Sequence, residues 1–108
     1  MSGAEAGIDG SLAAQVIATL RAQQAALRAA GIAHLSLFGS VARGDAEAES
    51  DVDILVELDG SARIGLFELV GLERRLAGLL ERKVDLLAEP VTKLRLRANI
   101  DRDRRHVF

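Results

Sequence analysis

Residues 39–53 read Gly-Ser-Val-Ala-Arg-Gly-Asp-Ala-Glu-Ala-Glu-Ser-Asp-Val-Asp, a Gly-Ser pair followed after ten residues by two aspartates one residue apart. Asp51 and Asp53 open the run Asp-Val-Asp-Ile-Leu-Val-Glu, whose β-branched residues favour a strand. Side chains alternate along a strand, so both carboxylates project from one face and the intervening apolar residues line the other. The pattern predicts a buried strand whose two acidic side chains can share a divalent cation.

The composition is that of one small globular domain. The chain has 108 residues, of which 49% are apolar, 28% charged and 3% aromatic, and it has no cysteine. Disulfides and thiolate metal sites are therefore excluded, and no apolar run approaches the roughly 20 residues of a membrane span. We expect a flexible leader at residues 1–10 and a single cytoplasmic domain at residues 11–108 without membrane contact.

Hydrophobic periodicity predicts a mixed fold. An amphipathic helix capped by Ser11 and stopped by Gly31 is expected first, and Gly39 is expected to end the strand that follows it. The expected elements are a helix over 11–30, a strand over 32–38, a short helical turn after Gly39, a loop over 44–50, a strand over 51–58, a buried helix over 64–80, a strand over 83–87 and a short helix over 91–99. This order indicates an α+β fold, a small sheet with helices packed on one face and the other face open to a ligand.

Three aspartates are the candidate metal ligands. Asp51 and Asp53 share a strand, and Asp85 joins them if its own strand lies beside theirs in a suitable register. Oxygen ligands of this kind suit hard cations such as Mg²⁺, which neutralise charge in phosphoryl and nucleotidyl transfer. The alternatives are a solvent-facing alternation on an edge strand for the pair and an isolated surface acid for Asp85.

The Gly-Ser turn is the candidate phosphate site. Gly39 allows the backbone to approach a ligand closely, and Ser40 offers a hydroxyl and a backbone N–H at a helix start. Arg43 is expected near the phosphates, with a structural ion pair to Asp45 as the alternative. A Gly-Ser turn alone is common, and its spacing to Asp51 makes it specific.

Residues 91–108 carry six basic and two acidic side chains, a balance of +4 against −6 for the rest of the chain. Without interleaved aromatic residues this is a weak nucleic-acid signal, so we expect a solvated last helix and a frayed end, and no direct nucleic-acid binding. His34 and His106 form no recognisable catalytic arrangement.

These motifs resemble those of minimal nucleotidyltransferases of the DNA polymerase beta-like superfamily. The resemblance covers residues 12–90 and rests on Leu-Phe-Gly-Ser-Val-Ala-Arg-Gly at 37–44, Ser-Asp-Val-Asp-Ile-Leu-Val at 50–56 and Arg-Lys-Val-Asp-Leu-Leu at 82–87. It implies a palm-like fold in which Asp51, Asp53 and Asp85 are catalytic and bind Mg²⁺, taken as two ions. It also implies that Gly39, Ser40 and Arg43 bind the nucleoside triphosphate.

Many short members of that superfamily are encoded beside a HEPN-domain ribonuclease toxin. The resemblance implies an antitoxin that transfers AMP from ATP to a tyrosine of such a toxin. Two alternatives stay open: a partner that masks the HEPN protein without catalysis, and a transferase acting on a small molecule of the aminoglycoside type. Nucleotide preference, the acceptor and the oligomeric state, homo-oligomer or hetero-oligomer, are not fixed by the sequence.

Overall fold

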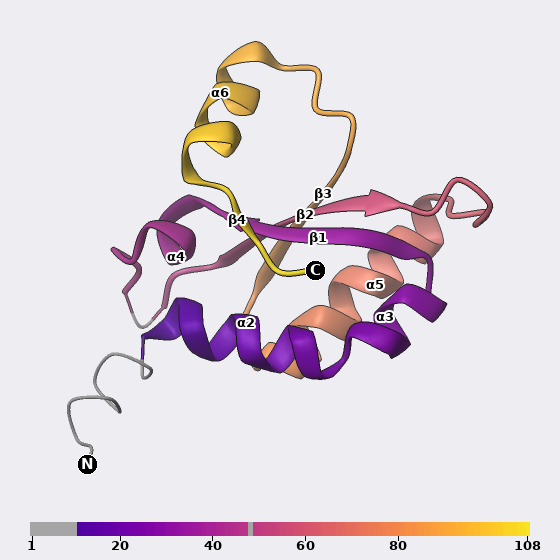
Figure 1. The fold of residues 1–108 in the computed structure, drawn as a ribbon, viewed down its shortest axis with the longest axis horizontal. Helices are drawn as coiled ribbons and strands as arrows, with labels where there is room; N and C mark the ends of the chain where they lie inside the picture. Colours follow the sequence, from indigo (N-terminus) through magenta and orange to yellow (C-terminus); the bar gives the residue numbers. More distant parts are fainter. Residues whose placement is uncertain (1–10, 48) are drawn as a thin grey trace.

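The protein folds around a four-stranded mixed sheet with the strand order β3-β2-β1-β4 (Figure 1). The computed structural model describes residues 11–47 and 49–108, so the leader expected at residues 1–10 lies outside the described part. In chain order the elements are α2 (Leu12–Ala22), α3 (Gln24–Ala29), β1 (Ile32–Phe38), α4 (Gly39–Arg43), β2 (Val52–Leu58), α5 (Leu66–Leu80), β3 (Val84–Ala88), α6 (Leu94–Asp103) and β4 (Arg105–His106). The predicted α+β class is confirmed.

The helix expected over residues 11–30 is two helices that meet at Gln23. Ser11 caps α2 as predicted, because its hydroxyl accepts a hydrogen bond from the Ala14 backbone N–H at 3.1 Å. Gln23 leaves the helical region, with φ −102° and ψ 11°, and α3 begins at the next residue. Gly31 follows α3 with φ +110°, a left-handed conformation that favours glycine.

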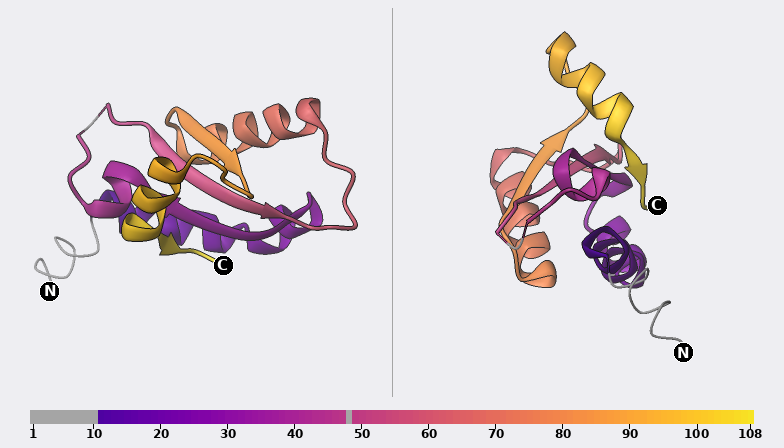
Figure 2. Two further views of the ribbon diagram at one scale, coloured as in Figure 1. Left: turned by 90° about the horizontal axis from the view of Figure 1, so that it is seen from above. Right: turned by 90° about the vertical axis from the view of Figure 1, so that its left-hand side faces the viewer.

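The sheet buries its main core on the face covered by α2, α3 and α5 (Figure 2). β1 runs antiparallel to β2, and β2 runs parallel to β3. The fully buried side chains of this core include Leu20, Leu27, Ile32, Leu35, Leu37, Ile54, Val56 and Leu76. The alternation predicted for β2 is confirmed, because its even-numbered residues face this core.

The second face of the sheet is partly covered by α6, on the side opposite the other long helices (Figure 2). Ile100 of α6 is 1% exposed and packs with Phe38 and Leu55 of the sheet. Leu87, Val91 and Leu96 surround this smaller cluster. The face that was expected to be open to a ligand is therefore covered by α6 around Phe38 and Leu55, and only the part outside this cluster can be open.

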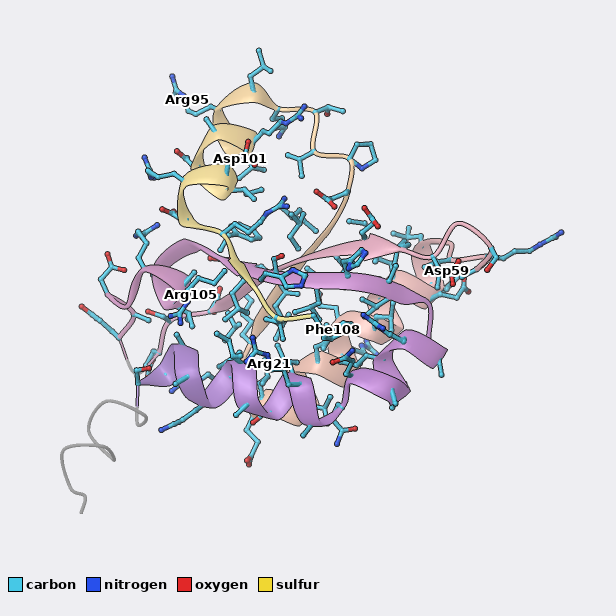
Figure 3. All side chains as sticks on the ribbon, viewed as in Figure 1. Arg21, Asp59, Arg95, Asp101, Arg105 and Phe108 are labelled. Atoms are coloured by element: carbon cyan, nitrogen blue, oxygen red, sulfur yellow. The ribbon has the colours of Figure 1, made fainter. Side chains whose placement is uncertain are left out.

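The predicted frayed end is wrong. β4 pairs antiparallel with β1, and beyond it Val107 and Phe108 are 3% and 5% exposed. Leu35 donates its backbone N–H to the Phe108 carbonyl at 2.9 Å, and Arg21 Nε donates to the Val107 carbonyl at 3.0 Å. Figure 3 shows Arg21 and Phe108 close together where α2 meets the end of the chain. The end of the chain is ordered because Val107 and Phe108, which follow the basic residues, are apolar and buried.

The helix expected to be buried over residues 64–80 is buried only in part. Leu72 and Leu76 of α5 are buried, whereas Leu66 and Phe67 are 77% and 91% exposed. The described glycines of α5 also do not serve close packing, since a Cβ at Gly71 would meet no described atom within 4 Å. Among the described residues no helix is long and apolar enough to cross a membrane.

Replacing Phe108 with Ala should destabilise the fold by about 3 kcal/mol, because it empties a buried aromatic position. Phe67→Ala is the matched control, and it should change the free energy of unfolding by less than about 0.5 kcal/mol because Phe67 is exposed. Urea denaturation of both variants measures the difference. Equal effects of the two substitutions would contradict the packing of the C-terminal residues.

Candidate active site

The site is built around a contact between Gly39 and Asp53. β1 ends at Phe38, and its register places Phe38 opposite Asp53 of β2. Gly39 then begins α4 with φ +75°. A Cβ at Gly39 would collide with the Asp53 carboxylate oxygen Oδ2 and lie 3.0 Å from the carboxylate carbon. Only glycine therefore allows this turn to lie directly against the Asp53 side chain.

Asp53 and Asp85 are brought together by the parallel pairing of β2 and β3. The register matches Asp53 with Asp85 directly, so the condition placed on Asp85 by the sequence is met. Leu55 and Leu87 follow them on the same face, next to Ile100 of α6. Two carboxylates thus stand side by side on the second face of the sheet, one of them beside the Gly39 turn.

This arrangement disfavours the charged form of Asp53. The pKa of Asp53 is raised from 3.8 to about 6, chiefly by burial and then by the negative charges of Asp85 and Asp51 and a hydrogen bond with Asp85. The positive charge of Arg43 opposes them. A cation bound here would relieve the repulsion between the carboxylates.

Asp51 also contributes charge to this site, because its carboxylate helps to raise the pKa of Asp53. It precedes β2 and forms an ion pair with Lys83, whose Nζ lies 3.7 Å from Asp51 Oδ2. Within the described parts of the chain no three His, Cys, Asp or Glu side chains form a group that could hold a metal ion. The donor chemistry nevertheless fits Mg²⁺, which proteins commonly bind through one or two carboxylates together with substrate phosphates.

Arg43 is held by two carboxylates. Its Nε donates to Asp45 Oδ2 at 3.2 Å, and its Nη1 donates to Asp103 Oδ2 at 2.8 Å. The ion pair with Asp45 is the alternative that the sequence left open for Arg43. Asp103 of α6 was missed by sequence reasoning, because no motif or spacing links residues that lie so far apart in the chain.

The family model that matches the amino-acid sequence is described as a nucleotidyltransferase domain, and the match extends over residues 20–107. The chain belongs to the nucleotidyltransferase domain family. The matched region contains the Gly39 turn and all four strands.

Individual relatives agree with this assignment. The chain is 38% identical over 63 residues to the protein adenylyltransferase MntA of Thermococcus cleftensis, a match that covers 58% of this chain and 62% of the relative. A solved structure described as a candidate minimal nucleotidyltransferase is 35% identical, with a TM-score of 0.61, and the match covers 82% of this chain and 92% of that one. The crystal structure of a toxin–antitoxin complex with AMP-PNP has a TM-score of 0.64 at 24% identity, covering 76% of this chain and 66% of that one, and shares the fold.

Asp53→Asn should stabilise the domain at neutral pH in the absence of metal. Between pH 3.8 and about 6 the folded protein keeps a proton on Asp53 that the unfolded chain releases, so native stability falls as the pH rises through this window. Asn carries no charge and avoids this loss, which we expect to be about 1 kcal/mol after solvent screening. Urea denaturation at pH 7.5 and pH 4 measures it, and an advantage that does not shrink at pH 4 would contradict the assignment.

Gly39→Ala should cost more stability than Gly44→Ala. Both glycines have positive φ, +75° and +85°, so each alanine brings roughly 1–2 kcal/mol of backbone strain. Only the alanine at 39 also collides with Asp53, since a Cβ at Gly44 meets no described atom within 4 Å. Denaturation of the two variants isolates the collision, expected at about 1 kcal/mol or more, and equal losses would show that Asp53 does not lie against the turn.

Proposed function

We propose that the protein is an Mg²⁺-dependent nucleotidyltransferase that transfers AMP from ATP to a hydroxyl group, a tyrosine of a HEPN-type toxin, and so acts as an antitoxin. The observation that carries the proposal is the pairing of Asp53 and Asp85 on adjacent strands beside the Gly39 turn. Similarity to the protein adenylyltransferase MntA supports the choice of AMP and of a protein acceptor. The match spans 62% of that relative's length.

The reaction is an in-line displacement at the α-phosphorus of ATP. The acceptor oxygen forms a bond to phosphorus, the bond between the α-phosphorus and the bridging oxygen breaks, and pyrophosphate leaves with that oxygen. Bound Mg²⁺ would supply positive charge for the phosphates, with Asp53 and Asp85 as its protein ligands and Asp51 as a further acid nearby. The proton of the acceptor hydroxyl passes to a carboxylate, for which Asp85 is exposed and therefore reachable.

The turn and Arg43 serve the nucleotide. Gly39 lies against Asp53 and Ser40 follows it in α4, so phosphates bound at this turn would stand beside the carboxylates. Asp53 is partly buried, whereas Asp85 is exposed. This difference suits Asp53 for the nucleotide side of the site and Asp85 for the acceptor side.

Exposed apolar side chains on two helices suit a protein acceptor. Leu66 and Phe67 of α5 and Leu94 of α6 are large apolar side chains that are 77%, 91% and 82% exposed, as is common at protein interfaces.

Asp53→Asn and Asp85→Asn should each lower AMP transfer by about a hundredfold or more, because each removes a charge that holds the cation. The assay combines the full chain, labelled ATP, Mg²⁺ and the product of the adjacent gene, expected to be a HEPN protein, and follows label on that partner. Asp101→Asn on α6 (Figure 3) removes the same charge from a residue that lines a cavity with Glu57 and Glu89, outside the pair of Asp53 and Asp85, and should leave transfer unchanged.

The alternatives give different results in the same assay. A masking partner would neutralise the toxin equally well with Asp53→Asn, and a small-molecule transferase would label an aminoglycoside without the HEPN protein. An unlabelled partner under all conditions would overturn the proposal. Repeating the assay with each of the four nucleoside triphosphates identifies the donor.

A further inference from the structure

Asp103, the last residue of α6, is a buried acid joined to the candidate site. Its side chain is 5% exposed, and its two oxygens accept hydrogen bonds from two arginines. Arg43 Nη1 lies 2.8 Å from Oδ2, and Arg102 Nε lies 3.1 Å from Oδ1. One of these arginines belongs to the turn that follows Gly39, so α6 is tied to the phosphate side of the site.

The contact is electrostatically strong. A carboxylate removed from water is stable only when its charge is met by hydrogen-bonded cations. The hydrogen bonds from Arg102 and Arg43 hold the pKa of Asp103 below its ordinary value, so Asp103 stays charged. Asp103 is therefore a fixed anion against which Arg43 is oriented.

The contact leaves Arg43 able to bind a ligand. A guanidinium has five N–H donors, and the bonds to Asp45 and Asp103 use one on Nε and one on Nη1. The Arg43 side chain is 41% exposed, which leaves the remaining donors accessible. A bound polyphosphate beside Gly39 would offer acceptors of the geometry that a guanidinium matches.

The contact also keeps Arg43 away from the candidate metal ligand. The positive charge of Arg43 lowers the pKa of Asp53, so the two groups feel each other's field. Yet the salt bridges of Arg43 to described residues go to Asp45 and Asp103, and none goes to Asp53. A guanidinium released from Asp103 could close on Asp53 and occupy the carboxylate that must face a cation.

We propose that Asp103 is a positioning residue for nucleotide binding. It holds Arg43 so that the free N–H groups of the guanidinium meet the polyphosphate while the Asp53 carboxylate stays open. This inference rests on the proposed function, and it assigns a task in ATP binding to α6, outside the Gly-Ser and Asp-Val-Asp motifs.

The test compares Asp103→Asn in the unaltered chain and in an Arg43→Gln chain. ATP affinity is measured with Mg²⁺ and a fluorescent ATP analogue, and KM and kcat are measured with the HEPN partner. If Asp103 acts through Arg43, Asp103→Asn should raise KM for ATP about tenfold with kcat within about twofold, and it should have no further effect once Arg43 is Gln. If Asp103 has a purely structural role, Asp103→Asn should change ATP affinity and KM equally in the unaltered chain and in the Arg43→Gln chain.

Two further variants sharpen the comparison. Arg43→Lys keeps the positive charge but loses the planar guanidinium, so it should raise KM for ATP as much as Asp103→Asn does. Because the Arg43 side chain is 41% exposed, this variant should fold even if Asp103→Asn does not. Asp101→Asn, two residues away on the same helix, should leave KM unchanged.

The outcomes separate this inference from the proposed function. If the unaltered chain binds no nucleotide, both are overturned. If the unaltered chain binds and transfers but Asp103→Asn or Arg43→Lys leaves KM unchanged, the positioning role alone is wrong. The same holds if Asp103→Asn acts equally with and without Arg43.

Discussion

The absence of a side chain at Gly39 is the constraint on which the site depends. The register of β1 and β2 brings Phe38 opposite Asp53, so the chain must turn directly beside the Asp53 carboxylate. A left-handed residue without a Cβ is what allows both the turn and the carboxylate to occupy this place. The parallel register with β3 then adds Asp85. Backbone geometry alone thus places the turn proposed to bind phosphate next to two carboxylates.

This closeness has an electrostatic consequence. Asp53 is partly buried, has Asp85 beside it and Asp51 nearby, and its pKa of about 6 shows that its charge is opposed by the protein around it. Asp51 differs, because Lys83 already partners it at 3.7 Å. Groups whose charge is opposed in this way are common where a fold serves binding or catalysis at the expense of stability. The carboxylate that gains most from a cation is therefore Asp53, in contact with the Gly39 turn.

The sequence predicts this part of the site because the features that define it lie within one short segment of the chain. The alternation around Asp53 fixes which face the acid occupies, and glycine at 39 has a conformational requirement of its own. The pairing of Asp85 depended on strand order, which periodicity does not determine. The pattern of apolar residues also misled on α5, where Phe67 belongs to the apolar stripe but the buried residues are Leu72 and Leu76. At Phe108 the preceding basic residues concealed a buried side chain. In both cases the burial of a side chain depends on which other element packs against it, and the local sequence does not contain that information.

Asp103 shows the same limit within the site itself. Its partner Arg43 lies 60 residues earlier in the chain, and the two meet where Ile100 packs α6 against Phe38 and Leu55. The apolar cluster thus holds α6 against the sheet. The hydrogen bond from Arg43 to Asp103 then fixes the guanidinium relative to α6. Loosening the cluster would move Asp103 and leave Arg43 with Asp45 as its remaining ion-pair partner among the described residues. The position of Arg43 is therefore set by the packing of α6 as much as by residues 39–53.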